Sequence, residues 1–291
     1  MANNEQRRKD AMRKLERELS RRERNEKLKP LGVVITTLAI LFAIGGGIYL
    51  LTTAGGDEST EADSATDTAT QPVALTATPV SGDAAPMKRA EALPETVTCE
   101  YPNDGEAAKA VDKPRTDNVP ATGTKTVTLK TNQGDIPMEL DRSLSPCGVN
   151  AIETMAQSGY FNDTVCHRVT GGGLNVLQCG DPTGTGTGGP GFKFAGEWPV
   201  KDSGLDQNAP VVYPKGSIAM ANPGDPDANG SQFFLNWADS QLPPQYTILG
   251  SMTEEGTKTV EGIAKNGIEG GGTSDGKPAK EVRIQTAEVK A

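Results

Sequence analysis

Histidine is nearly absent from this sequence: His167 is the one histidine in 291 residues. A Ser–His–Asp or Cys–His nucleophile system would have to use it. Cys166 precedes it directly, but neighbours on a strand point to opposite faces, so we interpret His167 as a hydrogen-bonded core residue. The four cysteines are 48, 19 and 13 residues apart, which fits no zinc site. We therefore predict neither a metal site nor a cofactor.

Aromatic residues are also scarce, at 4%, whereas the chain has 34 glycines and 20 prolines. This composition favours a turn-rich β protein over a helical bundle. The glycine-rich run GDPTGTGTGGPG at 180–191 lacks the Gly-Lys-Ser/Thr ending of a phosphate-binding loop, and no helix pattern follows it. We interpret this run as a solvent-exposed loop whose glycines allow tight turns.

Charge is missing altogether from residues 31–54, which are mostly apolar. As a helix these residues would span roughly 36 Å, enough to cross a bilayer with some tilt. A cleaved signal peptide is the alternative, but its apolar region would be shorter and an Ala-x-Ala cleavage site would follow. We therefore predict a transmembrane signal anchor that is not cleaved, which makes the lipid bilayer a partner of the chain.

Residues 1–30 carry eleven Lys or Arg and six Asp or Glu, so this segment is basic. A basic flank places the N-terminus in the cytoplasm and everything after residue 54 on the outer side of the cell membrane. The segment is either a helix with i,i+4 charge pairs or a plain charged tail. The rest of the chain is acidic, since the whole chain has a net charge of −9, and this argues against nucleic acid as a partner.

The outer part of the chain divides by composition. Residues 55–94 are rich in small and polar residues and have few large apolar groups, so we expect a flexible linker. Residues 95–123 would form an N-terminal extension of a regular domain that covers 124–291.

The four cysteines lie in the extension and the domain, on the predicted outer side, where disulfides can persist. They are Cys99, Cys147, Cys166 and Cys179. Two disulfides in any of three connectivities remain open, as do free buried thiols. A Cys166–Cys179 bond between neighbouring strands would need a β-bulge.

From about residue 124 the apolar pattern becomes regular. Two strands are predicted in 125–140 around the turn Asn132-Gln133-Gly134. Ser145 and Pro146 predict the start of a helix and Gly159 its end, and a second helix is predicted at 254–265. Asn229-Gly230 predicts a tight hairpin turn just before a strand at 231–235. Further strands are predicted at 164–169, 175–179, 217–222, 246–250 and 281–286. Many short strands with two helices indicate a closed barrel plugged at its ends.

Polar and apolar side chains recur on these predicted strands, with Gln232 and Phe234 on one face because they are two residues apart. The stretches that carry them are CHRVT (166–170), LQCGDPTGTGTGGPGFKF (177–194), YPKGSIAMAN (213–222) and NGSQFFL (229–235). In this order and spacing they closely resemble the cyclophilin-type peptidyl-prolyl cis-trans isomerases over residues 124–291. The cysteine pattern and the anchored N-terminus are similar to the membrane-tethered members of actinobacteria.

The resemblance implies a mainly β fold: a closed eight-stranded antiparallel barrel with an α-helix at each open end and a substrate groove on its outer face. Arg168 matches the catalytic arginine. Gln178 and Gln232 match two glutamines that orient the peptide and the arginine. Ala221 and Asn222 match a backbone segment that pairs with the substrate chain.

The resemblance also implies a proline pocket. Its floor and walls would be Phe234, Val176, Leu242 and Tyr246. The sequence departs from the family in this region: Gly171–Gly173 enlarge a hairpin, and Asn175 replaces a pocket aromatic. No tryptophan stands near Gln241, so weak cyclosporin binding is expected.

The implied activity is rotation about Xaa-Pro bonds during the folding of secreted or cell-surface proteins, with proline-containing polypeptides as substrates. Such a reaction breaks no covalent bond and so agrees with the missing nucleophile. The alternative is a tethered proline-peptide binding module, or a chaperone, with little turnover. A further alternative is a structural anchor whose residues 1–29 recruit cytoplasmic partners.

Overall fold

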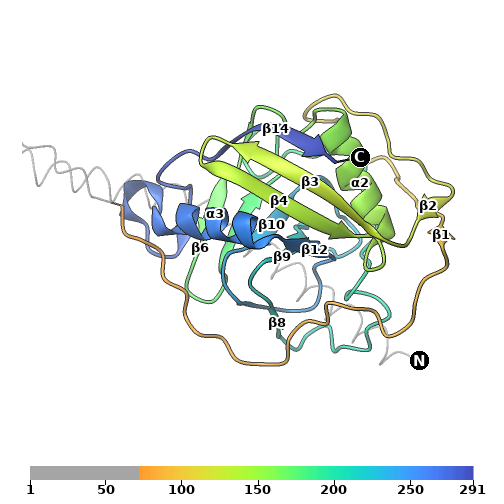
Figure 1. Ribbon diagram of the computed structural model, residues 1–291, viewed down its shortest axis with the longest axis horizontal. Helices are drawn as coiled ribbons and strands as arrows, with labels where there is room; N and C mark the ends of the chain where they lie inside the picture. Colours follow the sequence, from red (N-terminus) through yellow and green to blue (C-terminus); the bar gives the residue numbers. More distant parts are fainter. Residues whose placement is uncertain (1–71, 291) are drawn as a thin grey trace, which may run out of the picture. The chain divides into compact units, whose positions relative to one another are not determined.

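The computed structural model describes residues 72–290 (Figure 1). The predicted charged segment, the predicted membrane anchor and residues 55–71 of the predicted linker lie outside this range. Within it, none of the helices combines the length and the apolar character that crossing a membrane requires.

The strands β3 (Thr124–Thr131) and β4 (Gly134–Asp141) form a long antiparallel hairpin in an unbroken register from Thr124 opposite Asp141 to Thr131 opposite Gly134. Its inward positions alternate, and Leu129 and Ile136 are fully buried. The predicted hairpin at 125–140 is therefore confirmed, and its turn is formed by the two residues at 132–133.

Ten antiparallel strands form the main sheet around this hairpin. In spatial order they are β13 (Asp275–Gly276), β6 (Arg168–Thr170), β7 (Val176–Cys179), β10 (Phe233–Asn236), β9 (Ser217–Met220), β12 (Ile248–Met252), β4, β3, β14 (Arg283–Val289) and β5 (Thr164–Val165). Two small pairs lie outside this sheet: β1 (Thr96–Val97) with β2 (Val119–Pro120), and β8 (Val211–Tyr213) with β11 (Ser240–Leu242).

The main sheet curls strongly. Only Cys166 and His167 separate β5, at one edge, from β6, next to the other edge, so the two edges must approach each other. Within residues 72–290, however, no strand pairing joins β13 to β5. The prediction of a closed eight-stranded barrel is therefore wrong. The structure has a curled sheet of ten strands, because short edge strands extend the sheet without joining its two edges.

Two α-helices pack near opposite ends of the β3–β4 hairpin (Figure 1). Helix α2 (Pro146–Gln157) lies beside β14, β3 and β2, and helix α3 (Glu254–Lys265) lies beside β4 and β10. A short 3-10 helix, η1 (Glu269–Gly271), follows α3. The prediction of a helix at 254–265 is confirmed, and that of a helix from Pro146 is confirmed as well.

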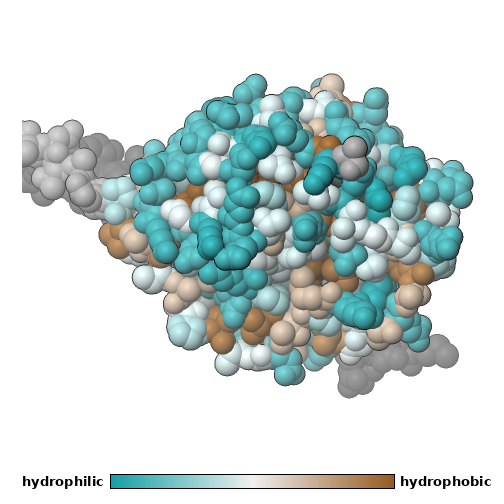
Figure 2. All heavy atoms as spheres, in the orientation of Figure 1, coloured by the Kyte–Doolittle hydropathy of each residue, from teal (hydrophilic) through white to brown (hydrophobic). Residues whose placement is uncertain are grey.

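Buried side chains on the two faces of the sheet form two separate clusters. The main core lies inside the curl, where Val169, Leu177 and Leu235 are fully buried. The outer face carries a smaller apolar cluster with Val176 and Phe234. Figure 2 shows that the exposed face in view is mostly hydrophilic with smaller hydrophobic areas.

The N-terminal segment is packed against the domain. Leu75 is 5% exposed and donates its N–H to Ala264 O, while Ala85 is 1% exposed and bonds to Val212 O. The predicted linker boundary at residue 94 is therefore corrected: 72–94 lie along the domain surface. A few apolar residues suffice because Leu75 and Ala85 join the buried clusters of the domain, which composition alone does not reveal.

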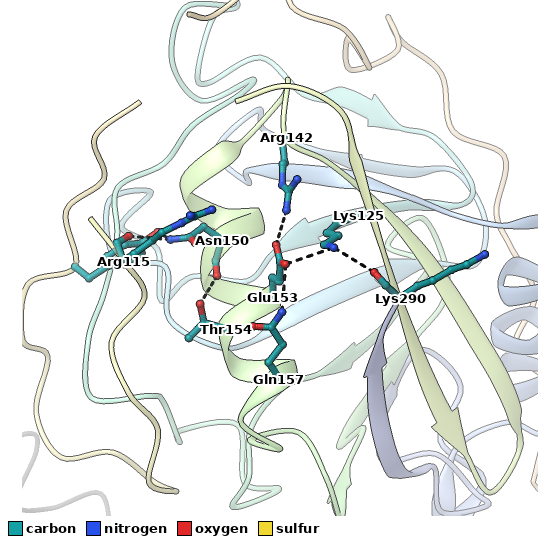
Figure 3. Close-up of polar contacts among 9 residues, drawn as sticks. Arg115, Lys125, Arg142, Asn150, Glu153, Thr154, Gln157 and Lys290 are labelled. Atoms are coloured by element: carbon teal, nitrogen blue, oxygen red, sulfur yellow. Dashed lines mark hydrogen bonds and ion pairs between the residues drawn. The ribbon is translucent and has the colours of Figure 1, made fainter. Parts of the chain in front are cut away.

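Helix α2 is tied to the hairpin by charge (Figure 3). Glu153 lies 2.7 Å from Arg142 and 3.8 Å from Lys125, and the Lys125 ammonium also donates to Lys290 O. On the other side of the helix, Asn150 donates to Arg115 O in the N-terminal extension. These contacts hold α2 between the sheet and the extension.

The N-terminus of α2 is capped in an unexpected way. Ser145 makes no side-chain capping bond and instead donates its hydroxyl to Ile248 O at 2.8 Å. The half-buried Glu197 carboxylate accepts the N–H groups of Cys147 and Gly148, at 3.1 and 2.8 Å. A carboxylate is well placed there, since it meets unpaired N–H groups and the positive end of the helix dipole.

The pair Asn229-Gly230 does not form the predicted hairpin turn. Neither residue has the positive φ that such a turn needs. Asn229 is fully buried and exchanges two backbone hydrogen bonds with Phe194, and its side chain donates to Pro226 O. Tertiary pairing therefore overrides the local signal, and a longer loop joins β9 to β10.

We predict that Glu197 makes the stability of the domain depend on pH. Burial raises its pKa to about 7, against the two backbone N–H groups that lower it. The folded state therefore holds the proton more tightly than the unfolded chain, so its contribution is complete below pH ~4.5 and is lost as pH rises through about 7. The free energy of unfolding of Glu197→Gln, relative to wild type, should shift by roughly 3 kcal/mol across this window.

Chemical denaturation at pH 4.5, 6 and 8 measures this difference. The same substitution at the exposed Glu106 is the control for loss of a surface carboxylate. A pH-independent difference for Glu197→Gln would contradict the prediction.

Candidate active site

Three strand registers place the predicted site residues in one row. Arg168 of β6 lies opposite Gln178 of β7, Gln178 lies opposite Phe234 of β10, and Phe234 lies opposite Ala219 of β9. Directly opposed residues share a face of the sheet, so this row lies on the outer face. The arginine, the glutamine and the aromatic ring are thus brought together as the sequence predicted.

The polar members of the site form a chain of hydrogen bonds. Arg168 Nη1 donates to Gln178 Oε1 at 3.1 Å, and Gln178 Nε2 donates to Gln232 Oε1 at 2.9 Å. Gln232 Nε2 in turn donates to the carbonyl oxygens of Gly186 and Gly188. Each amide both accepts and donates, so the chain fixes the orientation of all three side chains.

The glycine-rich run is a loop built around Asp181. Its carboxylate accepts the N–H groups of Thr183 and Gly186, at 2.7 and 2.6 Å. Burial raises the pKa of Asp181, but hydrogen bonds from Thr183 and backbone N–H groups outweigh burial, and the pKa lies below its ordinary value. A Cβ at Gly180 would lie 2.2 Å from Ser231 O, which explains why glycine is needed there. The loop supports Gln232.

The predicted pocket residues share the outer apolar cluster. The Phe234 ring lies 5.5 Å from that of Tyr246 in an edge-to-face arrangement, and Val176 and Leu242 pack in the same cluster. Sequence analysis did not find Tyr213, whose ring lies 6.3 Å from Phe234 and whose hydroxyl donates to Tyr246 O. Tyr213 belongs to β8, a strand that the sequence did not predict, and this strand places its ring beside Phe234.

An open cavity of about 400 Å³ adjoins the polar part of the row. Gln178, Gln232, Ala221 and Asn222 line it, together with residues 186–190 and Asp104 of the N-terminal extension. The Ala221 N–H bonds to Gln232 O, and the Asn222 side chain donates to Gln245 O. The predicted backbone segment therefore borders a space that an extended peptide can enter.

Asn175 does not stand in the proline pocket. It is fully buried, its side chain donates to Asp239 O, and its N–H donates to the Ser240 hydroxyl. The enlarged hairpin is also held, because Gly171 N–H bonds to Ser274 O and Gln241 N–H bonds to Gly173 O. Both departures from the family thus anchor the loop next to the site.

All four cysteines form disulfides: Cys99–Cys147 and Cys166–Cys179. The strand expected at 164–169 is interrupted between β5 and β6, and this irregularity brings Cys166 within 4.0 Å of Cys179, Cα to Cα. The bond joins the chain just before Arg168 to the chain just after Gln178.

The single histidine takes no part in this row. Burial lowers the pKa of His167, with Asp181 acting in the opposite direction. Its Nδ1 is buried without a hydrogen-bond partner among residues 72–290, so the expectation of a hydrogen-bonded core histidine is corrected. His167 lacks this partner because it lies in the interruption between β5 and β6.

The structure adds one charged contact that sequence analysis missed. Asp275 of β13 accepts two hydrogen bonds from Arg168, from Nε at 2.9 Å and from Nη2 at 2.7 Å. The two residues are more than a hundred positions apart and β13 has only two residues, so no local pattern could reveal the contact.

We predict that the two disulfides have separable effects. The 13-residue and 48-residue separations correspond to roughly 3 and 4 kcal/mol of stabilisation in the chain-entropy account. Replacing Cys166 and Cys179 by serine should lower the free energy of unfolding less than replacing Cys99 and Cys147. The first change alone should alter the Arg168 Nε–H resonance in an NMR spectrum. An unchanged resonance would show that the bond does not help to place Arg168.

Known proteins resemble this chain in sequence. The family model for "Cyclophilin type peptidyl-prolyl cis-trans isomerase/CLD" matches residues 126–289. The probable peptidyl-prolyl cis-trans isomerase B of Mycobacterium tuberculosis is 49% identical over 192 residues, which cover 64% of this chain and 62% of that protein. Its namesake in Mycobacterium leprae is 49% identical over 198 residues, 65% and 66% of the two chains.

A peptidyl-prolyl cis-trans isomerase of Helicobacter pylori is 38% identical over 143 residues, which cover 48% of this chain and 81% of that protein. The matches to the two mycobacterial proteins span less than two thirds of their lengths. The chain belongs to the cyclophilin-type peptidyl-prolyl cis-trans isomerase family, whose model matches residues 126–289.

Proposed function

We propose that the protein accelerates cis–trans rotation of Xaa-Pro bonds in polypeptides, with Arg168 as the catalytic residue. The observation that carries the proposal is the row in which Arg168, Gln178 and Phe234 lie opposite one another on three neighbouring strands. It places a charged donor and an apolar ring on one face of the sheet.

The reaction needs no reactive group. Rotation about a peptide bond has a barrier of about 18–20 kcal/mol because amide resonance is lost, and uncatalysed Xaa-Pro isomerisation takes tens to hundreds of seconds. A catalyst must bind the twisted bond better than either planar form. An apolar surface that removes water from the amide disfavours the charge-separated planar form. A charged donor near the proline nitrogen favours the twisted one.

The roles of the residues follow from this chemistry. Phe234, Val176, Leu242 and Tyr246 would hold the proline ring. Gln178 and Gln232 would hold the substrate backbone and keep the guanidinium in place, since they are already linked to it and to each other. Ala221 and Asn222 would align the peptide along the adjoining cavity.

We also propose that substrates are secreted or cell-surface proteins met outside the cell membrane. Support comes from the uncharged run at 31–54, the basic residues before it, and the two disulfides of the domain, which are typical of oxidising compartments. In this proposal residues 1–30 are cytoplasmic, 31–54 form the anchor and 55–71 connect it to the domain, as in a membrane-tethered cyclophilin.

The second candidate function is a binding module with little turnover, which Asn175 and the enlarged hairpin would favour if they loosened the pocket. Both have partners of their own beside the site, which weakens the case for a loose pocket. Weak cyclosporin binding remains our expectation. It rests on the absence of the tryptophan that the resemblance leads one to expect near Gln241, whose amide donates to Ser81 O in the N-terminal segment at 2.6 Å.

We predict that Arg168→Ala lowers turnover of an Xaa-Pro peptide at least about tenfold, equal to roughly 1.4 kcal/mol, because the charged donor is lost. Arg168→Lys should restore little, since lysine lacks the planar fork. NMR exchange or a protease-coupled assay measures turnover, and peptide affinity is measured on the same sample. Arg283→Ala, which removes another ion-paired arginine, is the control. Full turnover in Arg168→Ala would refute the assigned role, whereas binding without turnover in wild type would favour the binding module.

Topology is tested by cysteine labelling. In intact cells, a membrane-impermeant maleimide should label Ser59→Cys but should label Ser20→Cys only after lysis, because the two positions flank the proposed anchor. Equal labelling of both variants in intact cells would rule out the proposed orientation.

A further inference from the structure

The Arg168 side chain is held from the side opposite Gln178 by a carboxylate. Asp275 binds it through two parallel hydrogen bonds, Nε to Oδ1 at 2.9 Å and Nη2 to Oδ2 at 2.7 Å. This two-point geometry matches the planar fork of a guanidinium and fixes its orientation as well as its position. Gln178 completes the grip at Nη1.

The grip leaves the arginine able to act. A guanidinium has five N–H donors. The hydrogen bonds within residues 72–290 use two of them for Asp275 and one for Gln178, so two remain for a substrate. The contacts raise the pKa of Arg168 and lower that of Asp275, so both groups stay ionised.

Asp275 is itself held firmly in place. It lies opposite Thr170 in the β13–β6 pair, and Gly171 N–H bonds to Ser274 O beside it. At the base of the same segment, Glu269 N–H bonds to Lys277 O. A Cβ at Gly276 would come within 2.6 Å of the buried Ile268 side chain, so glycine lets the segment pack closely.

We propose that Asp275 is a positioning residue for the isomerase reaction: it orders the long Arg168 side chain before substrate arrives. An arginine has many rotamers, and ordering it during each catalytic event would raise the barrier. The inference rests on the proposed function, because it assumes that Arg168 acts on the substrate.

The energetic role of the pair in folding is small by comparison. The side chains of Arg168 and Asp275 are 37% and 51% exposed, and ion pairs exposed to this extent contribute little to folding stability. Loss of Asp275 should therefore affect turnover more than stability. This separates a positioning role from a structural one.

The test is Asp275→Asn, which keeps the size of the side chain and removes its charge and one acceptor. We expect kcat to fall between about three- and tenfold with KM nearly unchanged and the melting temperature nearly unchanged. Asp275→Glu, which keeps the carboxylate, should recover part of the loss. The Arg168 Nε–H resonance should broaden or shift in Asp275→Asn.

Glu269→Gln is the matched control, because Glu269 pairs with Lys277 at 3.3 Å in the same segment and is similarly exposed. It should leave turnover unchanged. In an Arg168→Ala background, Asp275→Asn should cause no further loss, whereas a structural role would give the same loss with or without Arg168.

The outcomes are distinguishable. Unchanged or raised turnover in Asp275→Asn, or an equal loss in the Arg168→Ala background, overturns the inference about Asp275. If Arg168→Ala itself keeps full turnover, the proposed function fails and this inference fails with it. If Arg168→Ala loses turnover and Asp275→Asn does not, the proposed function stands and only the positioning role is wrong.

Discussion

The register between β6, β7 and β10 is the constraint on which the site depends. Because side chains alternate along a strand, one register sends Val169, Leu177 and Leu235 into the core and places Arg168, Gln178 and Phe234 on the outer face. A slip by one residue would bury the guanidinium and expose the core. Burial of the core side chains therefore also determines the geometry of the site.

Around this row, polar groups restrain one another in sequence. Asp275 holds Arg168, Gln178 connects it to Gln232, and Gln232 rests on the loop that Asp181 organises. Arg168, Gln178 and Gln232 each have hydrogen-bond partners on both sides, which restrains the row in one arrangement. Preorganisation of this kind suits the proposed reaction, in which the protein can only favour one geometry of a bond over another.

Much of this could be predicted from sequence where local signals agree. The β3–β4 hairpin has strict alternation, and α3 carries Val260, Ile263 and Ala264 on one side, so the sequence predicts both elements. Long-range contacts had no such signal: Glu197 rather than Ser145 caps α2, and Phe194 pairs with Asn229 in place of a turn. Asp275 reaches Arg168 through a two-residue strand. In each case the partner lies dozens of residues away, and the fold alone brings it close.

The disulfide between Cys99 and Cys147 has a practical meaning for anyone who truncates the chain. A recombinant fragment that starts at residue 126, where the family match begins, would keep Cys147 but lose its partner. It would also uncover the apolar surface now shielded by Tyr101 and Val119. Such a fragment would carry an odd thiol beside a bare hydrophobic patch, a combination that invites covalent dimers and precipitation.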